Sequence, residues 1–180
     1  NTAVGEDCLQ ANTTASNNTA VGRRAMFSNT TGTDNVAMGH NALDANTTAS
    51  DNTAIGHDAL TTNTTGAFNT ALGGYALGAN TTASSNTAVG YTALESNTTG
   101  TRNTAVGVQA LELNTTGNDN VAVGHDALED NTASSNTAIG NYALTENTTA
   151  SNNTAVGYRA SHDNTTGTRN VSMGVDAMYQ

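Results

Sequence analysis

The sequence predicts an all-β fold, a parallel β-solenoid in which each repeat forms one coil. Three observations support this prediction. The first is that the 180-residue chain repeats one 17-residue segment about ten and a half times. The second is a glycine at the fifth position of every copy, and the third is that charged residues are confined to a few positions of the repeat. Helical repeats need roughly 33 residues or more, so this segment is too short for them. A unit of this length is typical of one rung in a stack.

The repeat reads Asn-Thr-Ala-Val-Gly-x-x-Ala-Leu-x-x-Asn-Thr-Thr-(Gly/Ala)-x-x, and we number its positions 1 to 17. Only the copy from Asn120 is shorter, because it lacks one Thr. Residues 1–180 are expected to form a single repetitive segment, interpreted as a fragment of a longer fibre because the chain stops within a copy. The copies begin at Asn1, Asn18, Asn35, Asn52, Asn69, Asn86, Asn103, Asn120, Asn136, Asn153 and Asn170.

Two short strands and two turns are expected in each coil. Positions 1 to 4 contain β-branched residues, which favour a strand. Position 5 accepts only glycine, which indicates a turn with positive φ or a close backbone approach. Asn-Thr-Thr at positions 12 to 14 predicts a second extended segment, closed by Gly or Ala at position 15. Coils spaced by about 4.8 Å would make a rod on the order of 50 Å long. The turn glycines are Gly5, Gly22, Gly39, Gly56, Gly73, Gly90, Gly107, Gly124, Gly140, Gly157 and Gly174.

The charged residues identify the solvent-facing positions. All 5 Arg and all 15 acidic residues occupy positions 6, 7, 10, 11 or 17, as do the seven aromatic residues and the four histidines. This segregation is expected if those positions form exposed turns on a constant scaffold. Stacked coils also place Glu6 and Asp7 beside Arg23 and Arg24 as opposite-charge pairs.

Composition excludes several classes of function. A net charge of −10 argues against a nucleic-acid partner, which needs a basic face. No stretch approaches the roughly 20 apolar residues of a membrane span. Position 4 of the repeat is apolar in every copy, which argues against disorder. Cys8 replaces an alanine of the repeat and is the single cysteine, so there is no disulfide framework.

Stacking predicts ladders of identical side chains. The Asn columns at positions 1 and 12 are expected to hydrogen-bond along the rod, and the Thr columns at positions 2, 13 and 14 can do likewise. If Thr and Val at positions 2 and 4 point into the coil, Ala at position 3 points out. Each coil offers few large apolar side chains, so we expect copies of the chain to pack together at that small outward residue.

The runs Asn-Thr-Ala-Val-Gly-Tyr-x-Ala-Leu, from Asn86, and Asn-Thr-Ala-Ile-Gly, from Asn52, resemble the head repeats of trimeric autotransporter adhesins. They also resemble repeats in phage and bacterial tail-fibre-type proteins, and the resemblance covers the whole chain. It implies a left-handed β-roll, a homotrimer, and an extracellular location on a cell surface or virion fibre. It further implies attachment to a host-surface receptor or glycan.

The motifs for chemistry are weak. His40 and His57 occupy position 6 in consecutive coils, and with Asp58 they form a conceivable metal site. Because this pattern does not recur in the other copies, we interpret the two histidines as exposed turn residues. Ser161 and His162 are adjacent without a third catalytic group. Calcium-binding nonapeptides and EF-hand loops are absent. We therefore expect no enzyme activity, no cofactor and no metal.

Asn-x-Ser/Thr sequences recur at position 12 in nine copies, where the Asn ladder is the favoured interpretation because a glycan would not fit inside it. Asn17 and Asn152, at turn position 17, are the candidate glycosylation sites.

The sequence thus predicts a non-enzymatic structural or adhesive segment of an extracellular fibre, whose variable turns make the contacts. One alternative is a filament subunit that stacks end to end through unpaired strand edges. Another is an ice-binding solenoid. Thr13 and Thr14 argue against it, because adjacent strand residues point to opposite sides.

Overall fold

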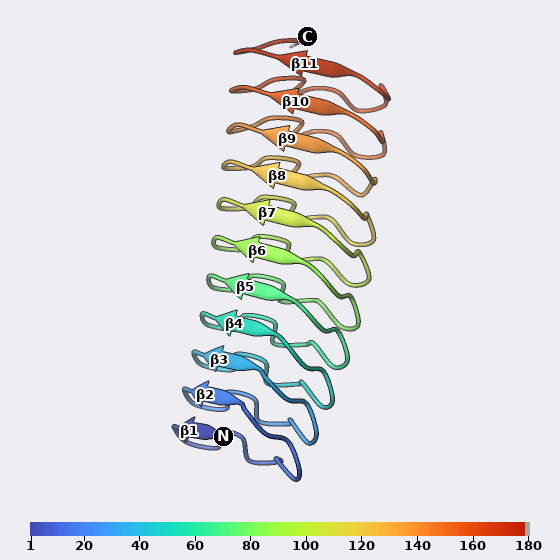
Figure 1. Cartoon of the computed structure of the whole chain (residues 1–180). Coiled ribbons are helices and arrows are strands. Elements are labelled where there is room, and N and C mark those ends of the chain that lie inside the picture. The colour runs from blue at the N-terminus through green and yellow to red at the C-terminus, as the bar shows by residue number, and fades with distance from the viewer. Residues whose placement is uncertain (179–180) are drawn as a thin grey trace.

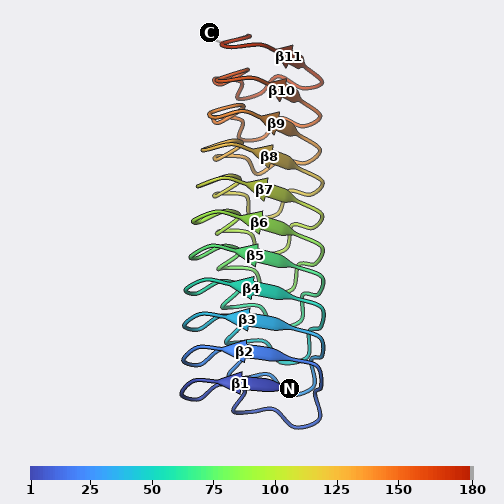
Figure 2. The same cartoon turned by 60° about the vertical axis from the view of Figure 1, so that its left-hand side comes forward.

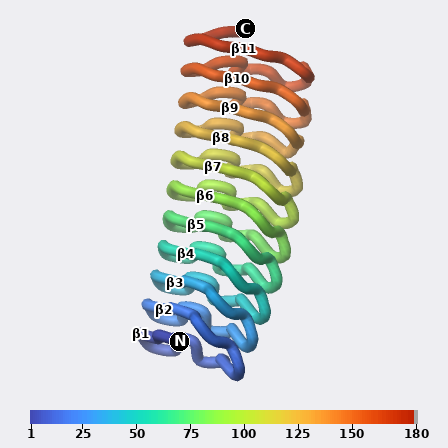
Figure 3. The backbone as a smooth tube through the Cα atoms, viewed as in Figure 1, coloured from blue at the N-terminus to red at the C-terminus, as the bar shows by residue number. Residues whose placement is uncertain are grey.

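The structure, a computed structural model, describes residues 1–178 and is a parallel β-solenoid of about ten turns. The coils stack into a rod with the two termini at opposite ends (Figures 1 and 3). Each 17-residue coil contributes one three-residue strand at positions 2 to 4, and the described residues contain no helix. The strands are β1 (Thr2–Val4), β2 (Thr19–Val21), β3 (Val36–Met38), β4 (Thr53–Ile55), β5 (Thr70–Leu72), β6 (Thr87–Val89), β7 (Thr104–Val106), β8 (Val121–Val123), β9 (Thr137–Ile139), β10 (Thr154–Val156) and β11 (Val171–Met173).

All eleven strands form one parallel sheet in chain order, as Figure 2 shows along the rod. Equivalent positions pair in register, so that Ala20 lies beside Ala37. The register continues through the short copy, where Ala122 pairs with Ala138. The missing residue is therefore accommodated outside the sheet.

The second strand expected at positions 12 to 14 is wrong for the described residues. Backbone hydrogen bonds still join this segment from coil to coil, and the N–H of Thr30 donates to the carbonyl of Thr47 at 2.9 Å. The N–H of Thr31 donates to the same carbonyl at 3.2 Å. In a parallel strand, consecutive N–H groups point in opposite directions. Two consecutive donors on one acceptor therefore describe a bend, with both threonines on the outside.

The expected outward direction of position 3 is also wrong. The alanines at this position are fully buried from Ala20 to Ala155, and they pack against the buried Ala and Leu columns of positions 8 and 9. The coil is narrow, so the leucine from one wall needs a small residue on the facing wall. Side chains alternate along a strand, and Thr and Val at positions 2 and 4 consequently point outward.

Two buried Asn ladders run along the rod in addition to the apolar core. At position 1, Asn86 Oδ1 accepts the N–H of Asn103 at 2.9 Å, and Nδ2 donates to the carbonyl of Gly100 at 2.8 Å. At position 12, Asn80 Nδ2 donates to Asn63 Oδ1 at 2.9 Å. The side chains of Asn63, Asn80 and Asn86 are all fully buried. The buried amides thus link the coils as predicted, and they satisfy backbone groups that water cannot reach.

The short copy interrupts the ladder at position 12. Asn131 Nδ2 donates to the carbonyl of Ala133, two residues ahead, whereas Asn80 uses Ala83, three residues ahead. Asn114 Oδ1, which faces the short copy, is buried and has no hydrogen-bond partner. The deletion of one Thr therefore preserves the sheet but leaves one buried acceptor unsatisfied.

Three non-glycine positions of the coil adopt left-handed backbone conformations. Positions 7, 9 and 17 have φ between 49° and 64°, and the fully buried Leu94 is one example at 52°. Such a conformation costs roughly 1–2 kcal/mol for a residue with a Cβ. The sequence does not indicate these left-handed conformations, because the three positions hold residues such as Leu, Asp, Arg, Tyr and Ser and are not restricted to Gly or Asn.

Thr92→Asn should stabilise the protein by about 1 kcal/mol. Thr92 is β-branched at φ 54°, 6% exposed, and its Oγ1 is buried without a hydrogen-bond partner. Asparagine has nearly the same volume and tolerates the left-handed region better, and Asn41 already occupies the equivalent position. The urea midpoint should rise. Thr61→Asn, outside the left-handed positions, should leave it unchanged, and an equal shift in both variants would argue against relief of strain.

Candidate functional surfaces

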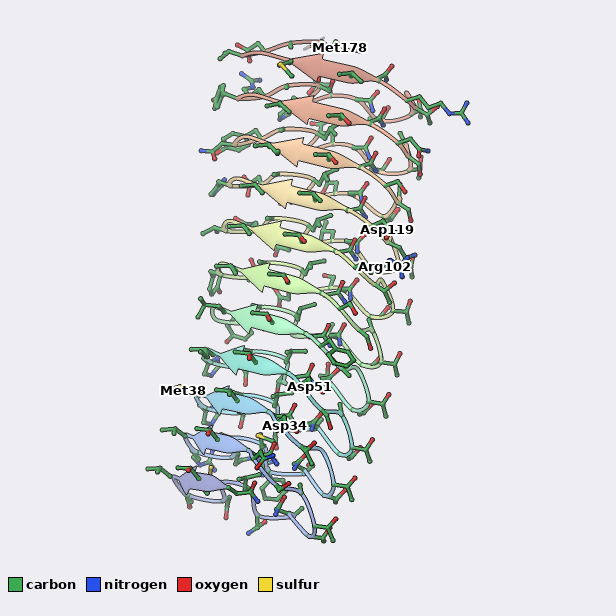
Figure 4. All side chains as sticks on the ribbon, in the orientation of Figure 1. Asp34, Met38, Asp51, Arg102, Asp119 and Met178 are labelled. Atoms are coloured by element: carbon green, nitrogen blue, oxygen red, sulfur yellow. The ribbon has the colours of Figure 1, made fainter. Side chains whose placement is uncertain are left out.

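The outward side of the sheet is the most regular surface of the protein. We define the sheet face as the side chains at positions 2 and 4 of β1 to β11. Position 2 is Thr in eight strands and Val in three, and position 4 is always apolar. Several position 4 side chains are 36–76% exposed, and Figure 4 shows Met38 where β3 ends. No strand contains a charged residue. An uncharged face of this length, with a continuous apolar column at position 4, is typical of a contact surface.

The turn after the strand carries two ladders of rings. In the first ladder the ring of His57 lies 5.2 Å from His40 and 5.1 Å from Tyr75, and Tyr75 lies 5.9 Å from Tyr91. The second runs His125–Tyr142–Tyr158 with centroid distances of 5.4 and 6.0 Å. These spacings allow edge-on and stacked ring contacts. The turns therefore offer ordered rings rather than independent side chains.

Charged side chains pair between coils, partly as expected. Arg23 Nε lies 3.2 Å from Glu6 Oε2, but Arg24 pairs with Asp44 rather than Asp7.

Among the arginine–carboxylate pairs of residues 1–178, the closest joins two exposed turns at position 17. Arg102 binds both carboxylate oxygens of Asp119, at 2.6 and 2.9 Å, and Figure 4 shows them together at one edge of the rod. The hydrogen bond from Arg102 lowers the pKa of Asp119. Exposed pairs contribute only about 0–1 kcal/mol, so they set register and solubility more than stability.

The five variable positions are not uniformly exposed. Asp126 and Thr92 at position 7 are 9% and 6% exposed, and Thr145 at position 10 is 9% exposed. At position 10, Glu95 and Glu129 lie one coil either side of Glu112. Burial raises the pKa of both. The charge of Glu112 adds to the shift of Glu95, and the charges of Asp126, Asp130 and Glu112 add to that of Glu129. The expectation of solvent-facing turns therefore holds for most of the variable positions but is wrong for the three residues with 6–9% exposure and for the buried Gly78 at position 10.

Ser161, considered above for catalysis, and Cys8, the single cysteine, are part of the scaffold. Ser161 is buried, and its Oγ donates to Ser172 Oγ at 2.8 Å. The two serines replace the usual Leu and Ala together, so the polar pair is satisfied inside the core. Cys8 is half-buried with its Sγ 3.2 Å from the carbonyl of Ala20, and burial raises the pKa of the thiol. Its thiolate form is therefore disfavoured.

The candidate glycosylation sites and the repeated sequons differ in exposure. Asn17 and Asn152 are exposed at position 17, and Asn17 Nδ2 donates to Asp34 Oδ1 at 3.0 Å. Asn29, Asn46 and most other position 12 asparagines are fully buried in the ladder. A glycan on a buried position 12 asparagine would disrupt the ladder. Of the two sets of sequons, Asn17 and Asn152 at position 17 are therefore the accessible ones.

Comparison with protein-family models, curated proteins and solved structures finds no match for this chain. Within residues 1–178, no helix has the length and apolar character needed to cross a membrane. The fold defines the class of the protein, a parallel β-solenoid repeat protein with one uncharged sheet face and ordered, variable turns.

Proposed function

We propose that this chain is a non-enzymatic structural segment of an extracellular fibre, in which copies of the chain pack through the sheet face. The observation that carries the proposal is the uncharged surface of Thr and apolar side chains that runs along all eleven strands. Burial of each exposed apolar side chain contributes roughly 1.5–3 kcal/mol. A contact repeated in every coil would supply the stabilisation that one narrow solenoid lacks.

A second copy of the chain is the partner that fits this surface. The two columns repeat once per coil, so a partner matches them along the whole rod only if it has the same axial spacing. A parallel copy of the chain has the same axial spacing, because its coils are the same. The resemblance to adhesin and tail-fibre repeats supports three copies around one axis and a left-handed coil.

The turns would then remain outside the assembly. The ring ladders and the charges at positions 6, 7, 10, 11 and 17 lie off the strands, and these side chains differ between coils. Any attachment to a receptor or glycan is therefore assigned to the turns, whereas the constant strands build the shaft.

Light scattering tests the assembly directly. We expect a mass three times the 18.2 kDa of the chain. Ile55→Asp, on the sheet face, should lower the mass towards that of the monomer, because it places a carboxylate in the contact. Thr65→Asp, in the exposed bend, should retain the trimer. A wild-type chain that is a stable monomer would contradict the proposal, and a mass that grows with time would favour the end-to-end filament.

An ice-binding solenoid is the second candidate, favoured by one observation. Thr at position 2 and an apolar residue at position 4 point outward from the same sheet in regular columns. The earlier objection, based on Thr13 and Thr14, does not apply because that segment is not a strand.

Thermal hysteresis tests this candidate on monomeric protein. If the face binds ice, the wild type should show hysteresis and Thr70→Lys should reduce it, since a charged side chain interrupts the column. Thr65→Lys should have no effect. Absence of hysteresis in the wild-type monomer removes this function.

A further inference from the structure

The turns after β3 and β4 bring three metal-ligating side chains together. His40 and His57 follow the turn glycines of consecutive coils, and their rings stack at 5.2 Å with an interplanar angle of 11°. Asp58 follows His57 in the chain. One nitrogen of each ring and one carboxylate oxygen of Asp58 all lie within 4.8 Å of one another.

Two polar atoms in this turn have no partner. His40 Nδ1 and Asn41 Oδ1 are buried and make no hydrogen bond. An unsatisfied buried polar atom costs about 1–3 kcal/mol, and a bound ion is one explanation for such an atom. The amide of Asn41 also orients the carboxylate, since Nδ2 donates to Asp58 Oδ1 at 2.9 Å. Hydrogen bonds of this kind orient the ligands of metal sites.

We propose that His40, His57 and Asp58 bind one divalent transition-metal ion, with Zn²⁺ as the matching example, and so join two consecutive coils. Two imidazoles and one carboxylate are ligands that Zn²⁺ accepts, with water in the remaining position. Binding needs ligand distances of about 2.0–2.2 Å, so the donor atoms must move closer together. The side chain of His57 is 49% accessible, and its Nδ1 already lies 3.2 Å from Asp58 Oδ2, so two of the three ligands approach each other from the solvent side.

Arg23 opposes the ion and provides a distinctive test. Its Nη1 lies 3.1 Å from His40 Nε2. Arginine only donates, so Nε2 must accept and the ring proton lies on Nδ1, the nitrogen without a partner. Arg23 therefore occupies Nε2 and keeps the proton on Nδ1, so it competes with an ion for both nitrogens of His40, and its guanidinium adds positive charge. Removal of Arg23 should strengthen metal binding.

The chain contains an internal comparison at the same positions of another coil. His125 and Asp126 repeat the His-Asp pair, with Nδ1 2.8 Å from Asp126 Oδ2. The ring of Tyr142 stacks on His125 where a second imidazole would be needed. A further cluster, Glu146 with His162 and Asp163, has a single imidazole. Neither matches the two-histidine site.

Calorimetric titration of the full chain with ZnCl₂ tests the proposal, after dialysis against a chelator. We expect His57→Gln to abolish the tightest binding event and the accompanying rise in melting temperature. Asn41→Ala should weaken it by roughly tenfold or more, and Arg23→Ala should tighten it. His125→Gln and His162→Gln should retain it.

Co²⁺ absorption gives an independent readout, since the visible band should disappear in His57→Gln and remain in His125→Gln. Circular dichroism establishes that each variant is folded, and Asp58→Asn serves as a second variant if His57→Gln is not. Equal Zn²⁺ affinity in wild type and a folded His57→Gln or Asp58→Asn would overturn the proposal. The result does not depend on whether the chain is a trimer.

Discussion

Gly107→Val should lower the free energy of unfolding by about 4 kcal/mol or more, the range of severe single substitutions. Gly107 has φ +141°, a region that side chains with a Cβ rarely adopt. A Cβ built there lies 2.6 Å from the carbonyl carbon of Gly124 in the next coil, and closer still to its oxygen. The contact atoms are backbone, so the clash is relieved only by separating the two coils. Melting followed by circular dichroism measures the loss.

The matched control is Glu112→Ala in the same coil. Glu112 is half-buried in a turn, where it accepts a hydrogen bond from Gln109 Nε2 at 2.8 Å. Its loss should change stability by no more than about 0.5 kcal/mol. Hydrogen exchange should place the damage of Gly107→Val near β7 and β8, because each coil contacts only its neighbours. Equal melting of the two variants would contradict the role assigned to the glycine.

Asn86→Ala should cost about 2–5 kcal/mol, the second of the large effects. Alanine removes the acceptor for the N–H of Asn103 and the donor to the carbonyl of Gly100. Both backbone groups lie in the interior, and each buried unsatisfied group costs about 1–3 kcal/mol. The urea midpoint of the purified chain measures the change.

Asn152→Ala is the control for the ladder, because Asn152 is the same residue type on an exposed turn. It should lower the free energy of unfolding by no more than about 1 kcal/mol, because Asn152 has a left-handed φ of 64° that alanine tolerates less well than asparagine. If Asn86→Ala were as mild as Asn152→Ala, the buried amides would not be what satisfies the backbone between coils.

The sequence-based predictions succeeded where a residue type has a single physical use. A glycine repeated in every coil implies a conformation that other residues avoid, and φ is between 126° and 143° at all eleven glycines. Repeated asparagines imply ladders of amides. The sequence-based predictions did not include the left-handed φ of Leu94 at position 9, because nothing in the local preference of leucine indicates it.

The period of 17 residues, the parallel stacking, the turn glycines and the stacking of His40 on His57 were determined by the sequence alone. The tertiary structure decided which side of each strand is buried. In a three-residue strand, either the middle side chain or the two outer side chains can face the interior. Here the middle alanine faces inward, because the leucine of position 9 packs against it across the coil. The tertiary structure also decided that Asn114 Oδ1 has no hydrogen-bond partner and that Arg23 Nη1 lies 3.1 Å from His40 Nε2. These contacts join residues of different coils, so their geometry depends on how the backbone of each coil closes.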